Sequence, residues 1–185
     1  MRMRLMFLAL LLLSVNLGVG LARKPQQNTT SCGFAVQTGS LEPTIKGPDE
    51  LVPLVHVVEQ PDSPIEVVSV DLTGMWLSVS EERMTERFCA KYRLRNRSDR
   101  TIQSFEIMLM LATHAGGSGG HGTLGSSPLL PGQMVDVESC GGGGHGGAGD
   151  NYLRLLVYVN HLDFEDCHYK PSLRVPRSLR VTTAW

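Results

Sequence analysis

The chain has 185 residues, of which 17 are Lys or Arg and 18 are Asp or Glu, so its formal net charge is −1 at pH 7. A near-neutral chain lacks the broad positive charge of nucleic-acid-binding proteins, so no nucleic-acid partner is expected. Its length suits one domain of ordinary size that can bury a hydrophobic core of its own.

The first 22 residues have the order that is typical of a secretory signal peptide. Arg2 and Arg4 precede an apolar run from Leu5 to Leu13, and small residues follow up to Ala22. An uncleaved anchor is the alternative, but no second segment approaches the roughly 20 apolar residues that a spanning helix needs. We therefore expect a secreted or periplasmic protein that has no membrane span after the signal is cleaved.

The chain contains four cysteines. An even number after an export signal predicts two disulfides, and the sequence leaves all three connectivities open. No two cysteines form a CxxC pair, so a zinc site or a thioredoxin-type site has no local support. The four are Cys32, Cys89, Cys140 and Cys167.

Composition and periodicity divide the chain into four segments. The signal peptide (1–22) precedes an irregular arm (23–53) that is rich in Pro, Gly, Thr and Gln, and a basic tail (171–185) ends the chain. Between them, residues 54–170 contain runs rich in β-branched and aromatic residues and no long amphipathic helix. The predicted strands lie within 54–60, 65–80, 87–96, 101–112, 133–139 and 152–164.

Residues 87–96 show the clearest strand pattern. Apolar Ala90, Tyr92 and Leu94 alternate with Lys91 and Arg93, which predicts one buried and one solvent-facing side. The links between the predicted strands are too short for crossover helices. An all-β fold, an antiparallel sandwich, is therefore expected.

Three stretches, "YRLRNRSDRTIQSFEIML", "LLPGQMVDVE" and "YVNHLDFEDC", resemble immunoglobulin-like or fibronectin-type sandwiches of small exported bacterial proteins. In such modules a strand that ends in Asn-x-Ser turns into the next strand, a Pro-Gly turn opens a later one, and the last ends near a "FEDG" turn. Cys167 stands here in place of that glycine. The resemblance spans roughly residues 65–170 and implies an immunoglobulin-like fold, without catalytic residues.

The resemblance also implies a disulfide pairing. If residues 87–96 and 133–140 are the second and fifth strands of such a sandwich, they run antiparallel, and the start of one lies near the end of the other. Cys89 would then pair with Cys140. Cys32 would tie the arm to Cys167.

Two runs, 113–128 and 139–151, are rich in glycine, and the first formally matches a catalytic and a cofactor motif. Residues 116–120 fit G-x-S-x-G with Ser118 as the nucleophile, and residues 117–122 fit G-x-G-x-x-G. Both motifs require a helix directly after the glycines, and "HGTLGSSPLLPG" cannot form one. We therefore interpret both matches as chance, expect flexible glycine-rich loops there, and expect no catalytic residue and no cofactor.

Three histidines in or beside these runs are weak candidates for metal ligands: His114, His121 and His145. Imidazole together with nearby carboxylates suits zinc, copper or nickel. However, a strand of about ten residues, roughly 30 Å long, would separate His145 from the other two and place them at opposite ends of the sandwich. No metal site is therefore expected.

The basic residues Lys91, Arg93, Arg95, Arg97 and Arg100 are expected to form an outward stripe and turn. Such a stripe could contact an anionic glycan or a protein, or it could simply keep an outer face soluble. The near-neutral net charge favours the second reading.

The leading hypothesis is an exported, non-catalytic binding or structural module of the cell envelope or extracellular space. Its partner would be a macromolecule, either a protein or an anionic glycan. One alternative is a metal-binding module that uses the histidines of the glycine runs. The other is a small hydrolase that uses Ser118 or a carboxylate.

Overall fold

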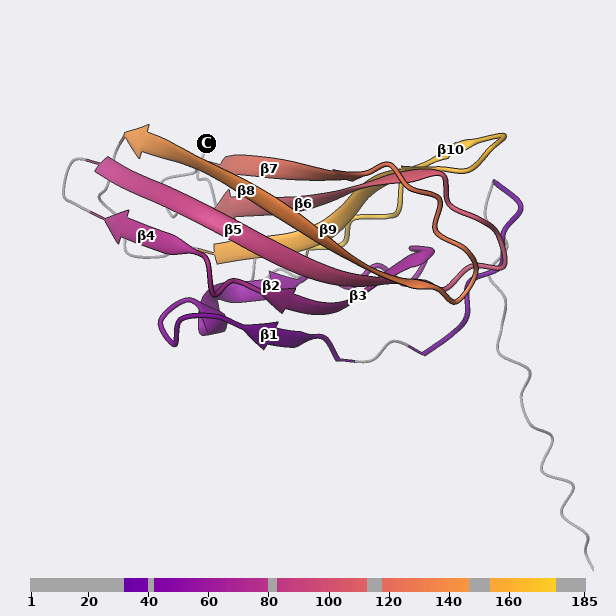
Figure 1. Cartoon of the computed structure of the whole chain (residues 1–185), viewed down its shortest axis with the longest axis horizontal. Helices are drawn as coiled ribbons and strands as arrows, with labels where there is room; N and C mark the ends of the chain where they lie inside the picture. Colours follow the sequence, from indigo (N-terminus) through magenta and orange to yellow (C-terminus); the bar gives the residue numbers. More distant parts are fainter. Residues whose placement is uncertain (1–31, 40–41, 80–82, 113–117, 147–153, 176–185) are drawn as a thin grey trace, which may run out of the picture.

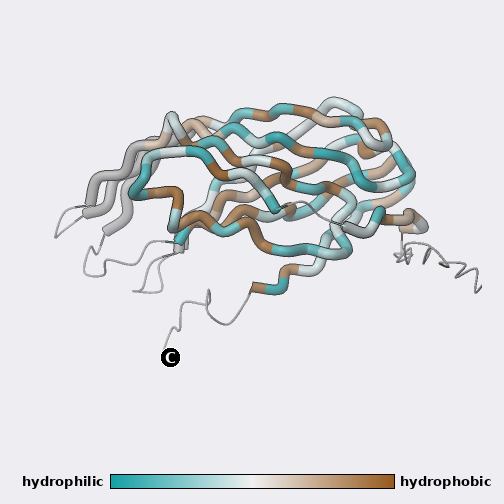
Figure 2. Tube along the Cα trace, turned by 90° about the horizontal axis from the view of Figure 1, so that it is seen from below, coloured by the Kyte–Doolittle hydropathy of each residue, from teal (hydrophilic) through white to brown (hydrophobic). Residues whose placement is uncertain are grey.

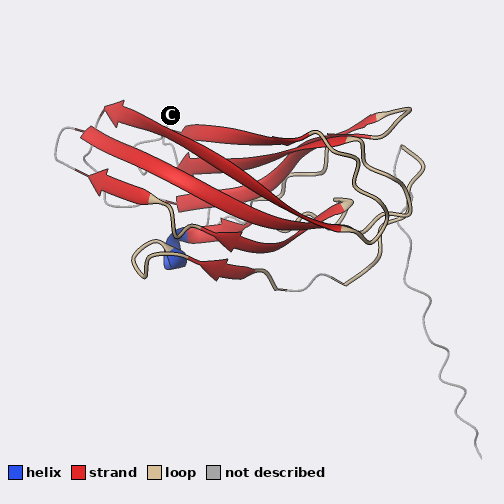
Figure 3. Cartoon of the chain, in the orientation of Figure 1, coloured by secondary structure: helices blue, strands red, loops and turns tan. Residues whose placement is uncertain are grey.

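The computed structural model describes residues 32–39, 42–79, 83–112, 118–146 and 154–175. The signal segment, His114 and the end of the basic tail lie outside these ranges. Within them the chain is almost entirely β-strand, with one short 3₁₀ turn, Val52–Leu54 (Figure 3). No helix in these ranges is long and apolar enough to cross a membrane.

The strands form two sheets of five strands each (Figure 1). The first sheet has the order β1-β3-β5-β4, with β8 on the other side of β5. It contains β1 (Thr44–Lys46), β3 (Ile65–Asp71), β4 (Trp76–Val79), β5 (Arg83–Asn96) and β8 (Met134–Gly146). The second sheet has the order β10-β9-β6-β7, with β2 beside β9. It contains β2 (Val55–Val57), β6 (Ser104–Ala112), β7 (Ser118–Gly125), β9 (Arg154–Asp163) and β10 (His168–Tyr169).

Both sheets are mixed, so the prediction of a purely antiparallel fold is wrong in two places. Strand β1 runs parallel to β3, and β2 runs parallel to β9. The chain passes from β1 in the first sheet through β2 in the second before it returns as β3. Strands joined by a crossover of this kind run parallel, whereas a hairpin would make them antiparallel.

One hydrophobic cluster joins the two sheets. On β5, Ala90, Tyr92 and Leu94 are buried, whereas Lys91 and Arg93 are exposed, which confirms the predicted alternation. Figure 2 shows hydrophobic and hydrophilic residues alternating along the strands. Buried side chains from the second sheet complete the cluster, among them Phe105, Ile107, Leu109, Val157 and Leu162.

Much of the two glycine-rich runs is strand, so the prediction of flexible loops is wrong over residues 118–125 and 141–146. The first range is β7, which pairs with β6. The second range extends β8 along β5 as far as the pair Arg83 and Gly146. Glycine has a low strand propensity, but the neighbouring strand supplies the ladder of hydrogen bonds. At Gly125 the missing side chain has a clear role, because an added Cβ would overlap the ring of Phe105 directly opposite.

The link between β5 and β6 is organised by Asn96, which is 0% exposed. Its amide nitrogen donates to the carbonyl oxygens of Arg100 (2.8 Å) and Leu129 (2.9 Å). Its amide oxygen accepts from the backbone N–H of Ser98 (2.8 Å) and from the Ser98 hydroxyl (2.7 Å). A Pro131-Gly132 turn then leads into β8, and Gly132 has the positive φ of 74° that the second central position of such a turn requires.

Both predicted disulfides, Cys32–Cys167 and Cys89–Cys140, are confirmed. Cys89 and Cys140 face each other directly across β5 and β8. Cys32 holds the start of the described arm against the residue before β10. Next to it, the ring of Phe34 lies 4.9 Å from the rings of both Phe164 and Tyr169. The described part of the arm is therefore packed onto the domain at Phe34, and it is irregular apart from β1, the 3₁₀ turn and a single bridge between Val36 and Ser98.

Candidate functional site

A cavity of about 440 Å³ lies where the arm crosses the edge of both sheets. The arm contributes residues 36–39 and 42–43. Strand β2 and the residues after it contribute 57–61, β3 contributes 65–67, and Arg97 and Val159 complete the wall. This volume lies within the range of about 300–1,000 Å³ in which small-ligand sites are found.

Most of the cavity wall is aliphatic. Val36, Val58, Ile65, Val67 and Val159 line it, and each is buried. Two exposed carboxylates, Glu42 and Glu59, also line it. The cavity therefore combines apolar walls with acidic side chains that face water.

Arg97 is the main polar group of the cavity, and its position differs from the one predicted. It was expected on the outward stripe, but it is only 5% exposed. The reason is that the arm runs beside it, because the Gln37 backbone N–H donates to the Arg97 carbonyl oxygen (3.1 Å) and residues 36–39 line the same cavity. The Arg97 backbone N–H donates to the Pro64 carbonyl oxygen (2.7 Å), and Nη2 donates to the Ser63 carbonyl oxygen (3.0 Å).

The Nε of Arg97 has no hydrogen-bond partner among the described residues. Burial lowers the pKa of this guanidinium, while the nearby Glu66 carboxylate acts in the opposite direction. An unpaired buried N–H costs about 1–3 kcal/mol, and more where the group is charged. Nε has almost no exposed surface, so this cost is internal to the fold.

Glu66 is the second buried charge of the wall, at 5% exposure. One carboxylate oxygen lies 2.6 Å from Nη2 of Arg95, which is its direct partner across β3 and β5. The sequence signals neither Glu66 nor Arg97. Glu66 alternates with buried Ile65 and Val67 and would be read as exposed. Its burial depends on the arm and on the strand register, which the sequence pattern does not contain.

Gln60 fixes the far side of the cavity. Its amide nitrogen donates to the Val159 carbonyl oxygen (3.0 Å), and its amide oxygen accepts from the Val159 backbone N–H (2.8 Å). The side chain thus prolongs the pairing of β2 with β9 beyond Val57. We interpret Gln60 as a structural clamp.

The outward basic stripe is largely neutralised by acidic residues. Arg93 makes two hydrogen bonds of 2.8 Å to Asp136, and these hold the pKa of Asp136 below its usual value. Lys91 lies 3.8 Å from Glu138, and Arg95 is paired with Glu66. This face therefore offers little uncompensated positive charge to an anionic glycan.

The histidines of the glycine runs are placed differently from the prediction. His121 lies in β7 opposite Leu109, and His145 lies in β8 opposite Met84. The prediction assumed that a single strand lies between His121 and His145 in the sequence. Because residues 118–125 are themselves a strand that reverses the chain, β7 and β8 lie against each other, and their glycine-rich parts are at the same end of the molecule (Figure 1). His114 lies outside the described residues.

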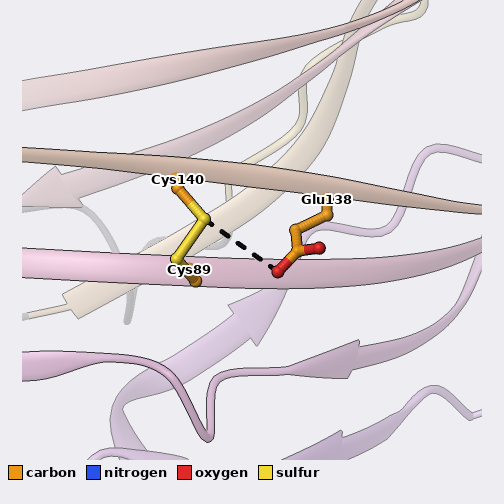
Figure 4. A group of neighbouring side chains, drawn as sticks. All are labelled: Cys89, Glu138 and Cys140. Atoms are coloured by element: carbon orange, nitrogen blue, oxygen red, sulfur yellow. Dashed lines mark hydrogen bonds between the residues drawn. A yellow bond between two sulfur atoms is a disulfide. The ribbon is translucent and has the colours of Figure 1, made fainter.

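Cys89, Cys140 and Glu138 form a compact group on the outer face of β5 and β8 (Figure 4). A Glu138 carboxylate oxygen lies 3.9 Å from the Cys140 sulfur. Three such ligands could hold a metal ion only if both thiols were free. Here the disulfide occupies both sulfurs, so the group is a cross-link beside a carboxylate.

Ser118, the serine of the G-x-S-x-G match, is the first residue of β7 and lies opposite Ala112. A strand follows it in place of the helix that a nucleophile elbow requires. The rationale for Ser118 as a nucleophile is therefore lost.

No protein-family model matches the chain, and comparisons with curated proteins and with solved structures find no significant match.

Proposed function

We propose that this protein is an exported, non-catalytic binding module of immunoglobulin-like type that takes up a segment of a partner protein in the cavity beneath the arm. The observation that carries the proposal is the cavity itself, whose wall combines buried aliphatic side chains with the guanidinium-bearing residue Arg97. The signal-like residues 1–22 and two disulfides, which form in oxidising compartments, support export.

The chemistry of the cavity favours a neutral ligand. Apolar walls suit an aliphatic or aromatic side chain, and a backbone carbonyl could accept a hydrogen bond from the Arg97 guanidinium. Glu42 and Glu59 would repel a sulfate or carboxylate group. A protein segment is therefore favoured over an anionic glycan.

A random peptide display library selected on the immobilised chain, residues 23–185, tests this. Enriched peptides should carry an apolar residue, and their affinity should fall at least about tenfold with Arg97→Met, as expected for loss of one hydrogen bond from a charged group. Arg174→Met is the matched control, because Arg174 is exposed and lies outside the cavity.

A second variant covers the case in which Arg97→Met fails to fold. Thr38 is exposed and lines the cavity, so Thr38→Trp should block the entrance without disturbing the core. Thr73→Trp, at an exposed turn outside the cavity, is its control. Peptides that bind both tryptophan variants equally well, or a preference for sulfated oligosaccharides over peptides, would refute the proposal.

A further inference from the structure

Two histidines outside the glycine runs are brought together by the β9–β10 hairpin. His168 opens β10 and lies directly opposite Asp163 of β9. His161 lies two residues before Asp163 on the same strand. The centroids of the two imidazole rings are 5.1 Å apart, with 36° between the ring planes.

A β-bulge turns His161 outward. Leu155, Val157 and Val159 are buried, and strict alternation would direct His161 and Asp163 inward as well. The register shifts instead, because Val159 pairs with Ile107 while His161 pairs with Glu106. Asn160 is the extra residue, so His161 and Asp163 lie on the outer face. Bulges of this kind commonly re-aim side chains beside functional sites.

Each imidazole is oriented by a carboxylate at Nδ1. His168 Nδ1 lies 2.7 Å from Asp163 Oδ1, and His161 Nδ1 lies 3.1 Å from Glu106 Oε2. The carboxylates are held in turn, because the Ser104 hydroxyl donates to Asp163 (2.5 Å) and the Asn160 amide donates to Glu106. A carboxylate at Nδ1 fixes the tautomer that leaves Nε2 as a metal ligand, as in carboxylate–histidine–zinc triads.

The hairpin that carries the histidines is rigidly held. Cys167, next to His168, is bonded to Cys32. The Phe164 backbone N–H donates to the Cys167 carbonyl oxygen (2.9 Å), and Arg100 pairs with Asp166 (2.5 Å). Ligands on a fixed scaffold do not have to be ordered when an ion binds.

We propose that His161 and His168 bind one divalent transition-metal ion such as Zn²⁺ through their Nε2 atoms. Two imidazoles on one tetrahedral zinc ion, with Zn–N distances of about 2.0–2.1 Å, have centroids roughly 5 Å apart, close to the spacing in this structure. The His161 and His168 side chains are 29% and 61% exposed, so water can complete the coordination. Asp163 and Glu106 act as outer partners that position the imidazoles.

Isothermal titration of the tag-free chain, residues 23–185, with zinc chloride tests the proposal. One ion should bind per chain, and binding should be lost in the double variant His161→Gln/His168→Gln. His56→Gln, a partly buried histidine on β2, is the matched control and should leave binding unchanged. Asp163→Asn should weaken binding about 10–100-fold if the carboxylate positions His168.

Absence of zinc binding by the wild-type chain would overturn the proposal. Zinc binding that survives the double variant would also overturn it, and would direct attention to His114, His121 and His145. Because His168 is largely exposed, the single variant His168→Gln should fold and gives the same comparison if the double variant does not. A change in the chemical shifts of the His161 and His168 ring protons on zinc addition, measured by NMR, separates ligation from a structural effect.

Discussion

Single residues show where the alternation of side chains along a strand no longer predicts which side chains are buried. Asn96 lies in an Asn-x-Ser sequence that would be a glycosylation sequon on a surface loop. Its amide is fully buried and makes hydrogen bonds to Ser98 and Arg100 in the turn and to Leu129 before β8. Arg97, the next residue, is buried although it continues the alternation of β5, because the arm runs beside it. Short polar motifs at strand ends thus have structural roles that the sequence pattern cannot distinguish from functional ones.

Asp62 is predicted to control the attachment of the C-terminal segment in acid. One of its carboxylate oxygens accepts from the Tyr169 hydroxyl (3.0 Å), the Ser172 backbone N–H (2.9 Å) and the Ser172 hydroxyl (2.7 Å). Partial burial raises the pKa of Asp62, but the hydrogen bonds from Ser172 and Tyr169 outweigh it, so the pKa is lower than in the detached chain. This stabilisation is therefore present above the ordinary pKa of about 3.9 and is lost as pH falls through the lower folded value.

Hydrogen exchange of the Ser172 amide, followed by NMR from pH 6 down to about pH 3, around the ordinary aspartate pKa, measures this attachment. Exchange should be faster in Asp62→Asn than in the wild type near neutral pH, and the two should converge in acid. Asp71→Asn is the control, because the pKa of Asp71 is also lowered, chiefly by the Thr73 backbone N–H, far from this segment. Identical exchange profiles for the wild type and Asp62→Asn would contradict the prediction.

At the level of elements, strands with strong alternation were predictable and glycine strands were not. Strands β6 and β9 fall within the predicted segments, and β5 begins four residues before its predicted segment of 87–96, because β-branched and aromatic residues mark most of their length. Strand β7 and the second half of β8 carry no such mark, since glycine has no side chain to show a buried face. Strand β7 pairs with β6 and β8 pairs with β5, and the local sequence of the glycine-rich segments does not reveal these neighbours. The missed strand also affects the histidines. Without β7, the sequence predicts His121 and His145 at opposite ends of the sandwich, whereas the glycine-rich parts of β7 and β8 that carry them lie at the same end.

A substitution at Gly125 tests whether the stability of the protein depends on glycine at this position of β7. The Phe105 ring lies over its backbone, so Gly125→Ala should force one of the two strands to shift, at a cost of about 1–3 kcal/mol for an overpacked core. Leu124→Ala on the same strand is the control, because Leu124 is 71% exposed and should change stability by less than about 0.5 kcal/mol. Chemical unfolding followed by circular dichroism measures both variants. Equal stabilities for the two would show that β7 can move away from Phe105 without penalty.

Across the whole molecule, the arm connects the two proposed sites. Cys32 anchors it beside the hairpin of His161 and His168, and residues 36–39 and 42–43 line the cavity. The two disulfides stabilise this arrangement in different ways. Cys89–Cys140 closes 51 residues between strands that already pair along their length, whereas Cys32–Cys167 closes 135 residues and is the covalent tie of the arm.

The two disulfides should therefore differ in what their removal releases. Chain entropy alone assigns about 5 kcal/mol to Cys32–Cys167 and about 4 kcal/mol to Cys89–Cys140 in stabilisation against global unfolding. Replacing Cys32 and Cys167 by serine should in addition loosen the start of the arm, because the ring contacts of Phe34 and the hydrogen bonds of Ala35 and Gln37 then hold it without a covalent tie. Replacing Cys89 and Cys140 should lower Tm but leave the arm protected, since β5 and β8 remain paired with their neighbours. Hydrogen–deuterium exchange of peptides covering residues 33–46, compared between the two double variants below their melting temperatures, checks this difference. Equal deuterium uptake by the arm in both variants would mean that its packing, and with it the cavity, does not depend on the covalent tie to the hairpin.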